Sequence, residues 1–275
     1  MSKTKERIHD SNLRYKQGLG QNFIYDEDLL AALVASSEIT KDDDVLEIGP
    51  GIGPLTQELS RRAGRVVSVE LDRSLLPILS ETMAGRENVE IVPGDILKTD
   101  LAALTAEKFP GLTPLACANL PYNITSPAIT ALIQAGVFAA ITVMIQREVA
   151  LRICARPGTP DYGAFSVFCQ YHTAPELLFE VSPSCFIPAP KVTSAVLRMT
   201  PRPAPAEVDD EAHFFRVVRA AFAQRRKTSS LSGLYTKEDI QEAIRICGLA
   251  PDVRGERLGI PEFAALSKAL RAQPQ

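Results

Sequence analysis

The sequence contains no long apolar run, no internal repeat and no low-complexity tract in its 275 residues. No stretch approaches the roughly 18 consecutive apolar residues that a membrane-spanning helix requires, so we expect no membrane insertion. The opening residues, Met1-Ser-Lys-Thr-Lys-Glu-Arg7, are polar and no apolar stretch follows them, so no secretory signal is expected. With 45% hydrophobic and 23% charged residues, the composition is that of a globular protein with a substantial core.

Cysteine and histidine are scarce and scattered. The five cysteines are odd in number and form no Cys-x-x-Cys pair, which argues against a disulfide framework and against a zinc site. The three histidines, His9, His172 and His213, are far apart in the sequence, so neither a metal site nor a histidine-based catalytic triad is indicated. We therefore expect no metal, and a location in a reducing compartment, the cytoplasm.

An overall excess of positive charge is also missing, because the formal net charge is −3. A nucleic-acid partner would therefore have to contact local basic clusters rather than a global field. Residues 1–20 form one basic segment, expected to be an arm. A second cluster ends an amphipathic helix, where Arg225, Arg226 and Lys227 are the predicted phosphate contacts. The alternative for this cluster is a solvated helix end that the helix dipole favours.

Apolar strands alternate with helical segments along the first two thirds of the chain. Strands are predicted at 44–48, 66–69, 89–92, 114–118 and 141–145. This alternation predicts an α/β fold with a Rossmann-like sheet whose ligands bind at the carboxyl ends of the strands.

A proline-rich stretch, residues 201–206, is the best domain boundary in the sequence. The apolar periodicity after it is helical throughout. The sequence therefore predicts a Rossmann-like domain at 1–200 and a small helical domain at 207–275.

A glycine loop, Gly49-Pro-Gly51-Ile-Gly53, follows the first of these strands and precedes a helix that begins with Pro54. A dinucleotide fingerprint, Gly-x-Gly-x-x-Gly, needs glycine at position 54, which is proline here. The observed Gly-x-Gly-x-Gly pattern is typical of S-adenosylmethionine (AdoMet) sites, although glycine loops also occur for other reasons. The loop favours AdoMet over a nicotinamide cofactor.

Polar residues also follow the next two strands. Glu70 is placed to accept the ribose hydroxyls of an adenosyl ligand. Asp95 could accept the exocyclic adenine amine, with Ile96 packing on the ring. The alternatives are a solvated strand end for Glu70 and a turn residue for Asp95. Asn22, after two glycines, is either a polar group at the mouth of the site or a turn residue.

The four residues Asn119-Leu120-Pro121-Tyr122 end the fourth strand and suggest the chemistry. The Asn119 side-chain oxygen and a backbone carbonyl of Leu120 or Pro121 can accept both hydrogens of an amine on a flat ring. Pro121 stiffens the turn, and Tyr122 can stack on the ring. The alternative is an ordinary turn with a half-buried tyrosine. Phe186 is either a second ring facing Tyr122 across a flipped base or a buried anchor of its proline-rich loop.

Seven segments together resemble the KsgA family, the small-subunit ribosomal RNA adenine N6,N6-dimethyltransferases. They are Gly20-Gln-Asn-Phe23, Val45-Leu-Glu-Ile-Gly-Pro-Gly51, Val69-Glu-Leu-Asp72, Gly94-Asp95, Asn119-Leu-Pro-Tyr122, Cys185-Phe-Ile-Pro-Ala-Pro-Lys-Val192 and Ala221-Phe-Ala-Gln-Arg-Arg-Lys-Thr228. The resemblance covers nearly the whole chain in one order. It implies an AdoMet domain, a small helical domain, and dimethylation of two adjacent adenines in a hairpin near the 3′ end of small-subunit rRNA.

The resemblance also implies roles for individual residues. The implied AdoMet-binding residues are Asn22, Ile24, Gly49, Gly51, Glu70, Asp95, Ile96 and Asn119. The implied catalytic residues are Asn119, Leu120, Pro121, Tyr122 and Phe186. Lys191 joins Arg225, Arg226 and Lys227 as an expected RNA contact. The expected partner is the immature 30S subunit, bound by a monomer.

Three other functions fit parts of the sequence. A ribosome-assembly factor could keep the fold without catalysis, although the intact glycine loop and Asn119–Tyr122 turn argue against that loss. A methyltransferase for large-subunit rRNA, of the macrolide-resistance type, would share the site but is expected to be more basic. A nucleotide-dependent dehydrogenase is disfavoured by Pro54.

Replacing Asn119 by alanine is expected to abolish methyl transfer and to leave RNA affinity nearly intact. The substitution removes the acceptor that holds the amine but no basic residue that contacts phosphate. Transfer of labelled methyl groups and RNA binding, measured on the same preparation, check this outcome. Turnover by the variant at the wild-type rate would rule out the assigned role of Asn119.

Overall fold

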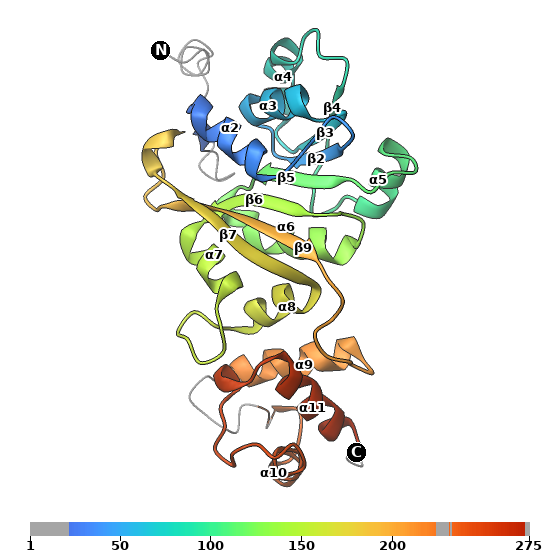
Figure 1. The fold of residues 1–275 in the computed structure, drawn as a ribbon, viewed down its shortest axis with the longest axis vertical. Coiled ribbons are helices and arrows are strands. Elements are labelled where there is room, and N and C mark those ends of the chain that lie inside the picture. Colours follow the sequence, from blue (N-terminus) through green and yellow to red (C-terminus); the bar gives the residue numbers. More distant parts are fainter. Residues whose placement is uncertain (1–21, 224–230, 232, 273–275) are drawn as a thin grey trace. The chain divides into compact units, whose positions relative to one another are not determined.

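The computed structural model describes residues 22–223, 231 and 233–272 (Figure 1). The basic arm at 1–20 and the cluster Arg225, Arg226 and Lys227 lie outside the described residues. The chain divides into two compact units. One consists of Met1–Ala150 and Glu176–Pro201, and the other of Leu151–Pro175 and Arg202–Gln275.

A seven-stranded sheet with the order β4-β3-β2-β5-β6-β9-β7 organises the first unit. Its strands are β2 (Asp44–Ile48), β3 (Arg65–Glu70), β4 (Val89–Pro93), β5 (Leu115–Asn119), β6 (Ile141–Gln146), β7 (Thr173–Val181) and β9 (Ser194–Pro201). β4, β3, β2, β5 and β6 pair in parallel, and β9 pairs antiparallel with β6. The predicted α/β fold is confirmed.

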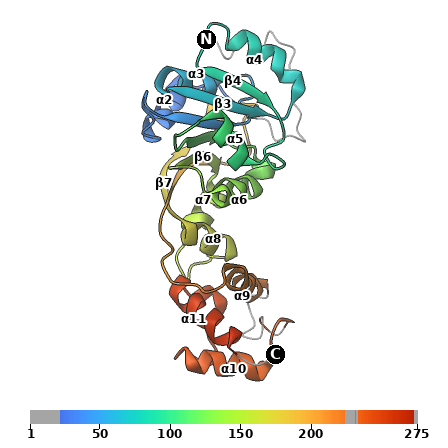
Figure 2. The same ribbon diagram turned by 90° about the vertical axis from the view of Figure 1, so that its right-hand side faces the viewer.

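Helices connect the parallel strands because a parallel pair needs a crossover. They are α3 (Pro54–Arg62), α4 (Leu76–Thr82), preceded by a 3-10 turn at Arg73–Leu75, α5 (Leu101–Lys108) and α6 (Thr125–Ala135), and a further helix, α2 (Glu27–Ser36), precedes β2. Figure 2 shows α2 and α3 on one side of the sheet and α5 and α6 on the other. Since helices cover both faces, the central strands are largely buried and rich in apolar residues.

The core between the sheet and the α2–α3 layer is aliphatic. Its members include Leu30, Leu33, Leu59, Val45, Val66 and Val196. Helix α2 starts sharply because the side chain of Asp26 accepts a hydrogen bond from the backbone N–H of Leu29 at 3.0 Å. Pro54 occupies the first turn of α3, as its lack of an N–H allows.

Two short antiparallel strands form a second sheet, separate from the seven-stranded sheet. It consists of β1 (Phe23–Ile24) and β8 (Phe186–Ile187), and β8 follows a 3-10 turn at Pro183–Cys185. Phe23 pairs with Ile187, and Ile24 pairs with Phe186. We call this pair of strands the β1–β8 ribbon.

The second unit is helical and has an aromatic core. Its elements include α8 (Ala164–His172), α9 (Glu211–Ala223), α10 (Lys237–Ile246), a 3-10 turn at Gly255–Arg257 and α11 (Ile260–Arg271), and α7 (Arg147–Cys154) spans the boundary between the units. Fully buried side chains include Tyr162, Phe214 and Phe263. The segments with amphipathic periodicity beyond residue 207 form helices.

The unit boundaries differ from the sequence-based division in one segment. The sequence assigned 151–175 to the first domain, whereas the structure groups it with the helices that follow the linker. The reason is aromatic packing: the ring of Tyr171 on α8 lies 5.2 Å from that of Phe214 and 5.3 Å from that of Phe215, both on α9. Among the described residues, no helix is long and apolar enough to span a bilayer.

Candidate active site at the carboxyl edge of the sheet

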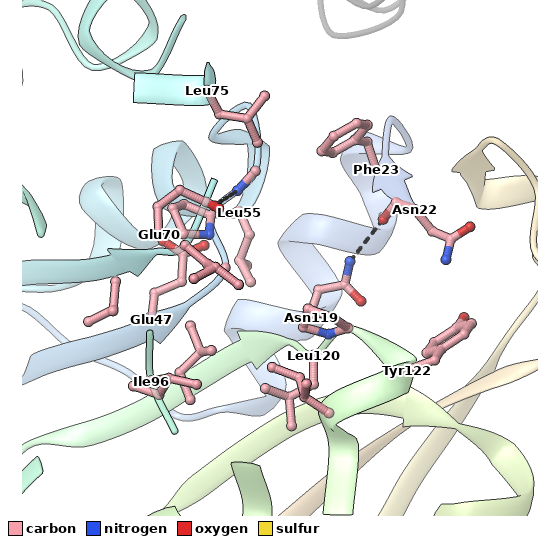
Figure 3. Close-up of a pocket in the computed structure, with 18 of the residues that line it drawn as sticks. Asn22, Phe23, Glu47, Leu55, Glu70, Leu75, Ile96, Asn119, Leu120 and Tyr122 are labelled. Carbon is pink, nitrogen blue, oxygen red and sulfur yellow. Dashed lines mark hydrogen bonds between the residues drawn. The ribbon is translucent and has the colours of Figure 1, made fainter. Parts of the chain in front are cut away.

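A cavity opens where β2, β3, β4 and β5 end (Figure 3). The parallel strands all point their carboxyl ends to one edge, so the loops that follow them meet there. Every predicted AdoMet-binding residue lines this cavity: Asn22, Ile24, Gly49, Gly51, Glu70, Asp95, Ile96 and Asn119. Leu120, Pro121 and Tyr122 line it too. The structure therefore brings together residues that are up to 100 positions apart in the sequence.

The glycine loop approaches its neighbours too closely for a larger residue. Gly49 and Gly51 have φ angles of +67° and +63°, in the region that favours glycine. A Cβ atom on Gly51 would lie only 2.7 Å from Cε1 of Phe23. Gly49 lies against the turn Asn119–Tyr122, because its Cβ would be 3.7 Å from Cγ of Pro121. Backbone, rather than side chains, thus forms this wall of the cavity.

Glu70 ties the glycine loop to the end of β3. Its Oε2 accepts a hydrogen bond from the Gly51 N–H at 3.1 Å, and its Oε1 accepts one from the Asp72 N–H at 2.7 Å. Burial raises the pKa of the Glu70 carboxyl, and the two backbone donors oppose that shift. Each carboxylate oxygen has two lone pairs, so it can also accept a hydrogen bond from a hydroxyl of a ligand.

Asp95 and its neighbours form the end of the cavity beyond β4. The Asp95 Oδ1 accepts a hydrogen bond from the Leu97 N–H at 3.0 Å, which fixes a tight turn. Ile96 is 4% exposed, and the cavity wall also includes Leu71 and Leu97, whose side chains are largely exposed. Apolar side chains next to one carboxylate suit a flat ring with an amino group.

The side-chain amide of Asn119 has a defined orientation. Its Nδ2 donates a hydrogen bond to the backbone carbonyl of Asn22 at 3.2 Å (Figure 3). The amide nitrogen is thereby directed at the β1 segment, and Oδ1 remains to accept a hydrogen bond from a substrate. This is the orientation that an amine substrate requires.

The turn after Asn119 indicates which carbonyl could accept the second hydrogen. The Pro121 carbonyl already accepts hydrogen bonds from the Ile124 N–H at 3.1 Å and from Thr125 Oγ1 at 3.2 Å. These bonds close the 3-10 turn Tyr122–Ile124. The carbonyl of Leu120 is therefore the better of the two acceptors considered from the sequence.

The hydroxyl of Tyr122 forms a short hydrogen bond of 2.6 Å with Oγ of Ser194. Ser194 is the first residue of β9, is fully buried, and lies opposite Gln146 in the sheet. Burial raises the pKa of the Tyr122 phenol, so the hydroxyl is neutral. The sequence contained no signal for this contact, because 72 residues separate the partners.

Glu47, like Ser194, was not among the site residues predicted from the sequence. It is 1% exposed and lines the cavity from β2, where its Oε2 accepts hydrogen bonds from Thr56 Oγ1 at 2.7 Å and Ser68 Oγ at 2.6 Å. Burial raises the pKa of Glu47 to about 7, against the opposing effect of the two hydroxyls. An acidic residue inside the apolar strand 44–48 was the available signal.

The remaining predicted site residues lie elsewhere. Phe186 is 2% exposed and does not line the cavity, because pairing with Ile24 turns its ring into the core beneath α2. Its stacking on a target base opposite Tyr122 stays a prediction. Lys191 is exposed and outside the cavity wall. Among the described residues, no cluster of three or more acidic, histidine or cysteine side chains could hold a metal.

The sequence matches the profile of one protein family along most of its length. The family is described as "Ribosomal RNA adenine dimethylase", and the match spans residues 12–271. The chain belongs to this family. The predicted resemblance to the KsgA family is thereby confirmed, and the chain is an adenine dimethyltransferase of ribosomal RNA.

Curated relatives in the ribosomal RNA adenine dimethylase family match this chain from end to end. "Ribosomal RNA small subunit methyltransferase A" of Alkaliphilus metalliredigens is 43% identical over 279 residues, which cover 99% of this chain and 97% of the relative. The protein of the same name from Geobacillus thermodenitrificans is 44% identical over 278 residues, covering 98% and 95%.

Solved structures agree on the fold. The 23S rRNA methyltransferase ErmE has a TM-score of 0.68 at 27% identity, and the match covers 91% of this chain and 100% of the ErmE chain. A dimethyladenosine transferase from Plasmodium falciparum has a TM-score of 0.70 at 22% identity, covering 89% and 95%. The predicted Rossmann-like methyltransferase fold is confirmed.

Replacing Glu47 by glutamine is expected to remove a pH dependence of stability. The folded protein holds the Glu47 proton more tightly than the unfolded chain, whose pKa is near 4.5. The resulting stabilisation is complete below pH 4.5 and is lost as pH rises through about 7. The free energy of unfolding of the wild type, relative to that of the variant, should fall by about 3 kcal/mol over this range.

Denaturant titrations of both proteins at several pH values check this prediction. Glu90→Gln is a control of opposite sign, because ion pairs with Lys108 and Arg65 lower the pKa of Glu90. Parallel pH profiles for wild type and Glu47→Gln would contradict the prediction.

Ser194→Ala and Tyr122→Phe each remove the same hydrogen bond. Each should reduce turnover by roughly fivefold, which corresponds to the net free energy of one hydrogen bond. The double variant should be no slower than either single variant, because both lose one shared interaction. Initial rates of methyl transfer measure this cycle, with Ser36→Ala as a control serine outside the site. Independent, multiplying effects would show that the bond does not hold the ring.

Proposed function

We propose that this chain transfers methyl groups from AdoMet to N6 of two adjacent adenines, in a hairpin near the 3′ end of small-subunit rRNA. The observation that carries the proposal is the oriented amide of Asn119, whose Oδ1 remains to accept a hydrogen bond from the amine of a base. The substrate class follows the curated relatives, which are 43% and 44% identical and named for the small subunit.

The residues of the cavity suit AdoMet in four respects. The glycine loop lets a ligand approach the backbone, and Glu70 offers carboxylate oxygens to ribose hydroxyls. Asp95 and Ile96 offer an acceptor and an apolar surface to the adenine ring. The wall also includes the buried carboxyls of Glu47 and Glu70, which favour a ligand that carries positive charge. AdoMet, when bound, supplies an electrophilic methyl carbon on a sulfonium.

The protein's contribution to the reaction is to hold and orient the target amine. The N6 lone pair of adenine is delocalised into the ring, so the amine is a poor nucleophile. Oδ1 of Asn119 and the carbonyl of Leu120 would accept its two hydrogens and favour a pyramidal nitrogen with its lone pair directed at the methyl group. Catalysis by positioning and preorganised dipoles needs no general base, and the excess proton is lost after transfer.

Tyr122 would hold the base by stacking. Stacking of a base on an aromatic ring is worth on the order of 1–3 kcal/mol. The hydrogen bond to Ser194 fixes the ring from its far end, so the ring does not have to be ordered when the base arrives.

We further propose that the first unit carries the chemistry and that the helical unit contacts RNA. Lys191 on the first unit is an exposed cation suited to phosphate. The predicted contacts Arg225, Arg226 and Lys227 lie outside the described residues. The chain would act as a monomer on the immature 30S subunit in the cytoplasm.

Labelled methyl groups should pass from AdoMet to immature 30S subunits that lack the modification. Large-subunit particles and free adenosine are the controls, because ErmE, a 23S rRNA methyltransferase, shares the fold. Dimethyladenine in small-subunit rRNA alone is the expected product. Product in large-subunit rRNA would instead support the large-subunit alternative, and tight subunit binding without transfer would support a non-catalytic assembly factor.

A further inference from the structure

We propose that the carboxyl of Glu47 gives up a proton when AdoMet enters the cavity, and that the resulting carboxylate is the counter-charge of the sulfonium. The inference deepens the proposed function and rests on it, since it concerns the cofactor of the same site. It makes the cofactor affinity of this chain depend on pH near neutrality.

Glu47 belongs to the wall of the cavity although it is almost completely buried. It lies on β2, two positions before Gly49, and pairs with Ser68 of β3 in the sheet. Its exposed fraction is 1%, and it lines the cavity among the side chains drawn in Figure 3. The carboxyl is therefore shielded from bulk water but lies next to the space for a ligand.

One oxygen of the Glu47 carboxyl is held by the protein and the other is not. Oε2 accepts hydrogen bonds from Thr56 Oγ1 at 2.7 Å and from Ser68 Oγ at 2.6 Å. Oε1 has no hydrogen-bond partner among the described residues. Because Oε2 accepts two hydrogen bonds, the proton of the neutral acid belongs on Oε1, and Oε1 is the atom that a ligand can affect.

No cation among the described residues of the wall compensates Glu47. The polar groups near it are the hydroxyls of Thr56 and Ser68, the carboxyl of Glu70 and the thiol of Cys117. Glu70 adds a like charge, and burial raises the pKa of Cys117 to about 12, so this thiol is neutral. Burial, the largest effect, raises the pKa of Glu47 to about 7. About half of the molecules therefore carry the proton at neutral pH.

Glu70, the other buried carboxyl of the wall, differs in what holds it. Its two oxygens accept hydrogen bonds from the backbone N–H groups of Gly51 and Asp72. These fixed dipoles favour the carboxylate of Glu70 even when no ligand is bound. Glu47 has only side-chain hydroxyls, so it is the carboxyl whose charge most depends on a ligand.

AdoMet brings the positive charge that the wall lacks. It carries a sulfonium and an ammonium group against a single carboxylate, so it is a net cation. A cation and a carboxylate attract each other more strongly in an apolar surrounding than in water, and this attraction lowers the pKa of the carboxyl. Binding should therefore move the proton from Oε1 of Glu47 to solvent.

Methyl transfer removes the charge that Glu47 compensates. The sulfur keeps the electron pair of the broken bond and becomes a neutral thioether, while the target amine gains the methyl group and loses a proton to solvent. Glu47 then has no counter-charge and takes a proton back from solvent. The neutral acid attracts the product less than the carboxylate attracts AdoMet, which favours release of the product.

Glu47→Gln tests the counter-charge, because glutamine has nearly the same shape but no charge at any pH. AdoMet affinity is measured by calorimetry without RNA between about pH 6 and about pH 8. Over this range the ionised fraction of Glu47 rises from about one tenth to about nine tenths. Relative to the variant, the wild type should therefore bind AdoMet about tenfold more tightly at the higher pH. Titrations of AdoMet itself and of Glu70 are common to both proteins and cancel in this ratio.

Two further readouts separate charge from packing. Binding heats in buffers of different ionisation enthalpy give the protons released, and at about pH 7 the wild type should release about half a proton more per AdoMet than Glu47→Gln does. S-adenosylhomocysteine lacks the sulfonium, so its affinity should change less than about threefold over the same pH range. A carboxyl that only supports the fold would affect both ligands equally.

Ser68→Ala tests the same carboxyl without altering it. Ser68 is fully buried and does not line the cavity, but its hydroxyl opposes the rise in the pKa of Glu47. Without it, the midpoint of the pH dependence of AdoMet affinity should move up by about one unit. Glu90→Gln is the control, because Glu90 lies on β4 outside the cavity wall and should leave the pH profile unchanged.

The same pH profile of AdoMet affinity in the wild type and in Glu47→Gln would overturn the proposal. An equal pH effect on AdoMet and on S-adenosylhomocysteine would overturn it too. If Glu47→Gln does not fold, an unshifted midpoint in Ser68→Ala decides against the inference. A wild-type protein that binds no AdoMet at any pH would instead overturn the proposed function.

Discussion

The hydrogen bond from Nδ2 of Asn119 to the carbonyl of Asn22 is the contact on which the candidate chemistry depends. A side-chain amide has donors at one end and an acceptor at the other, and only one of its two orientations can hold an amine. The partner is a backbone carbonyl, which cannot rotate independently of its strand. The position of the β1 segment therefore decides the orientation, and the packing of the ribbon between the α2 core and Gly51 decides that position.

The second constraint is the presence of carboxyl groups in a largely apolar edge of the sheet. Glu47 and Glu70 are both buried, and burial raises the pKa of each carboxyl. A like charge adds to the rise, from Glu70 on Glu47 and from Asp72 on Glu70. Hydroxyls hold Glu47 and backbone N–H groups hold Glu70. Neither lysine nor arginine is among the described residues of the cavity wall. Such a wall favours a cationic ligand, and it makes the carboxyls structural supports of the loop as well as ligand acceptors.

Helix and strand patterns were predictable because they depend on short-range periodicity and on local breakers. The buried strand 44–48, the glycine loop and Pro54 at the start of α3 are adjacent in sequence, so their geometry is a local property. The boundary of the second unit was not predictable in the same way. Aromatic residues in 151–175 showed that the segment packs in a core, but not in which one, because the partners of Tyr171 lie on α9.

The sequence by itself determined the class of fold, and it predicted the cofactor type and the residues at the ends of the strands, since each follows from a motif that is contiguous in the chain. Only the tertiary structure decided how those residues act on one another. It placed Ser194 against Tyr122 across 72 residues and the Asn22 carbonyl against Asn119 across 97. It also turned Phe186 into the core, because the partner that sets its direction, Ile24, lies on a strand more than a hundred residues away. No local pattern encodes contacts of that range, so they become visible only when the packed chain is known.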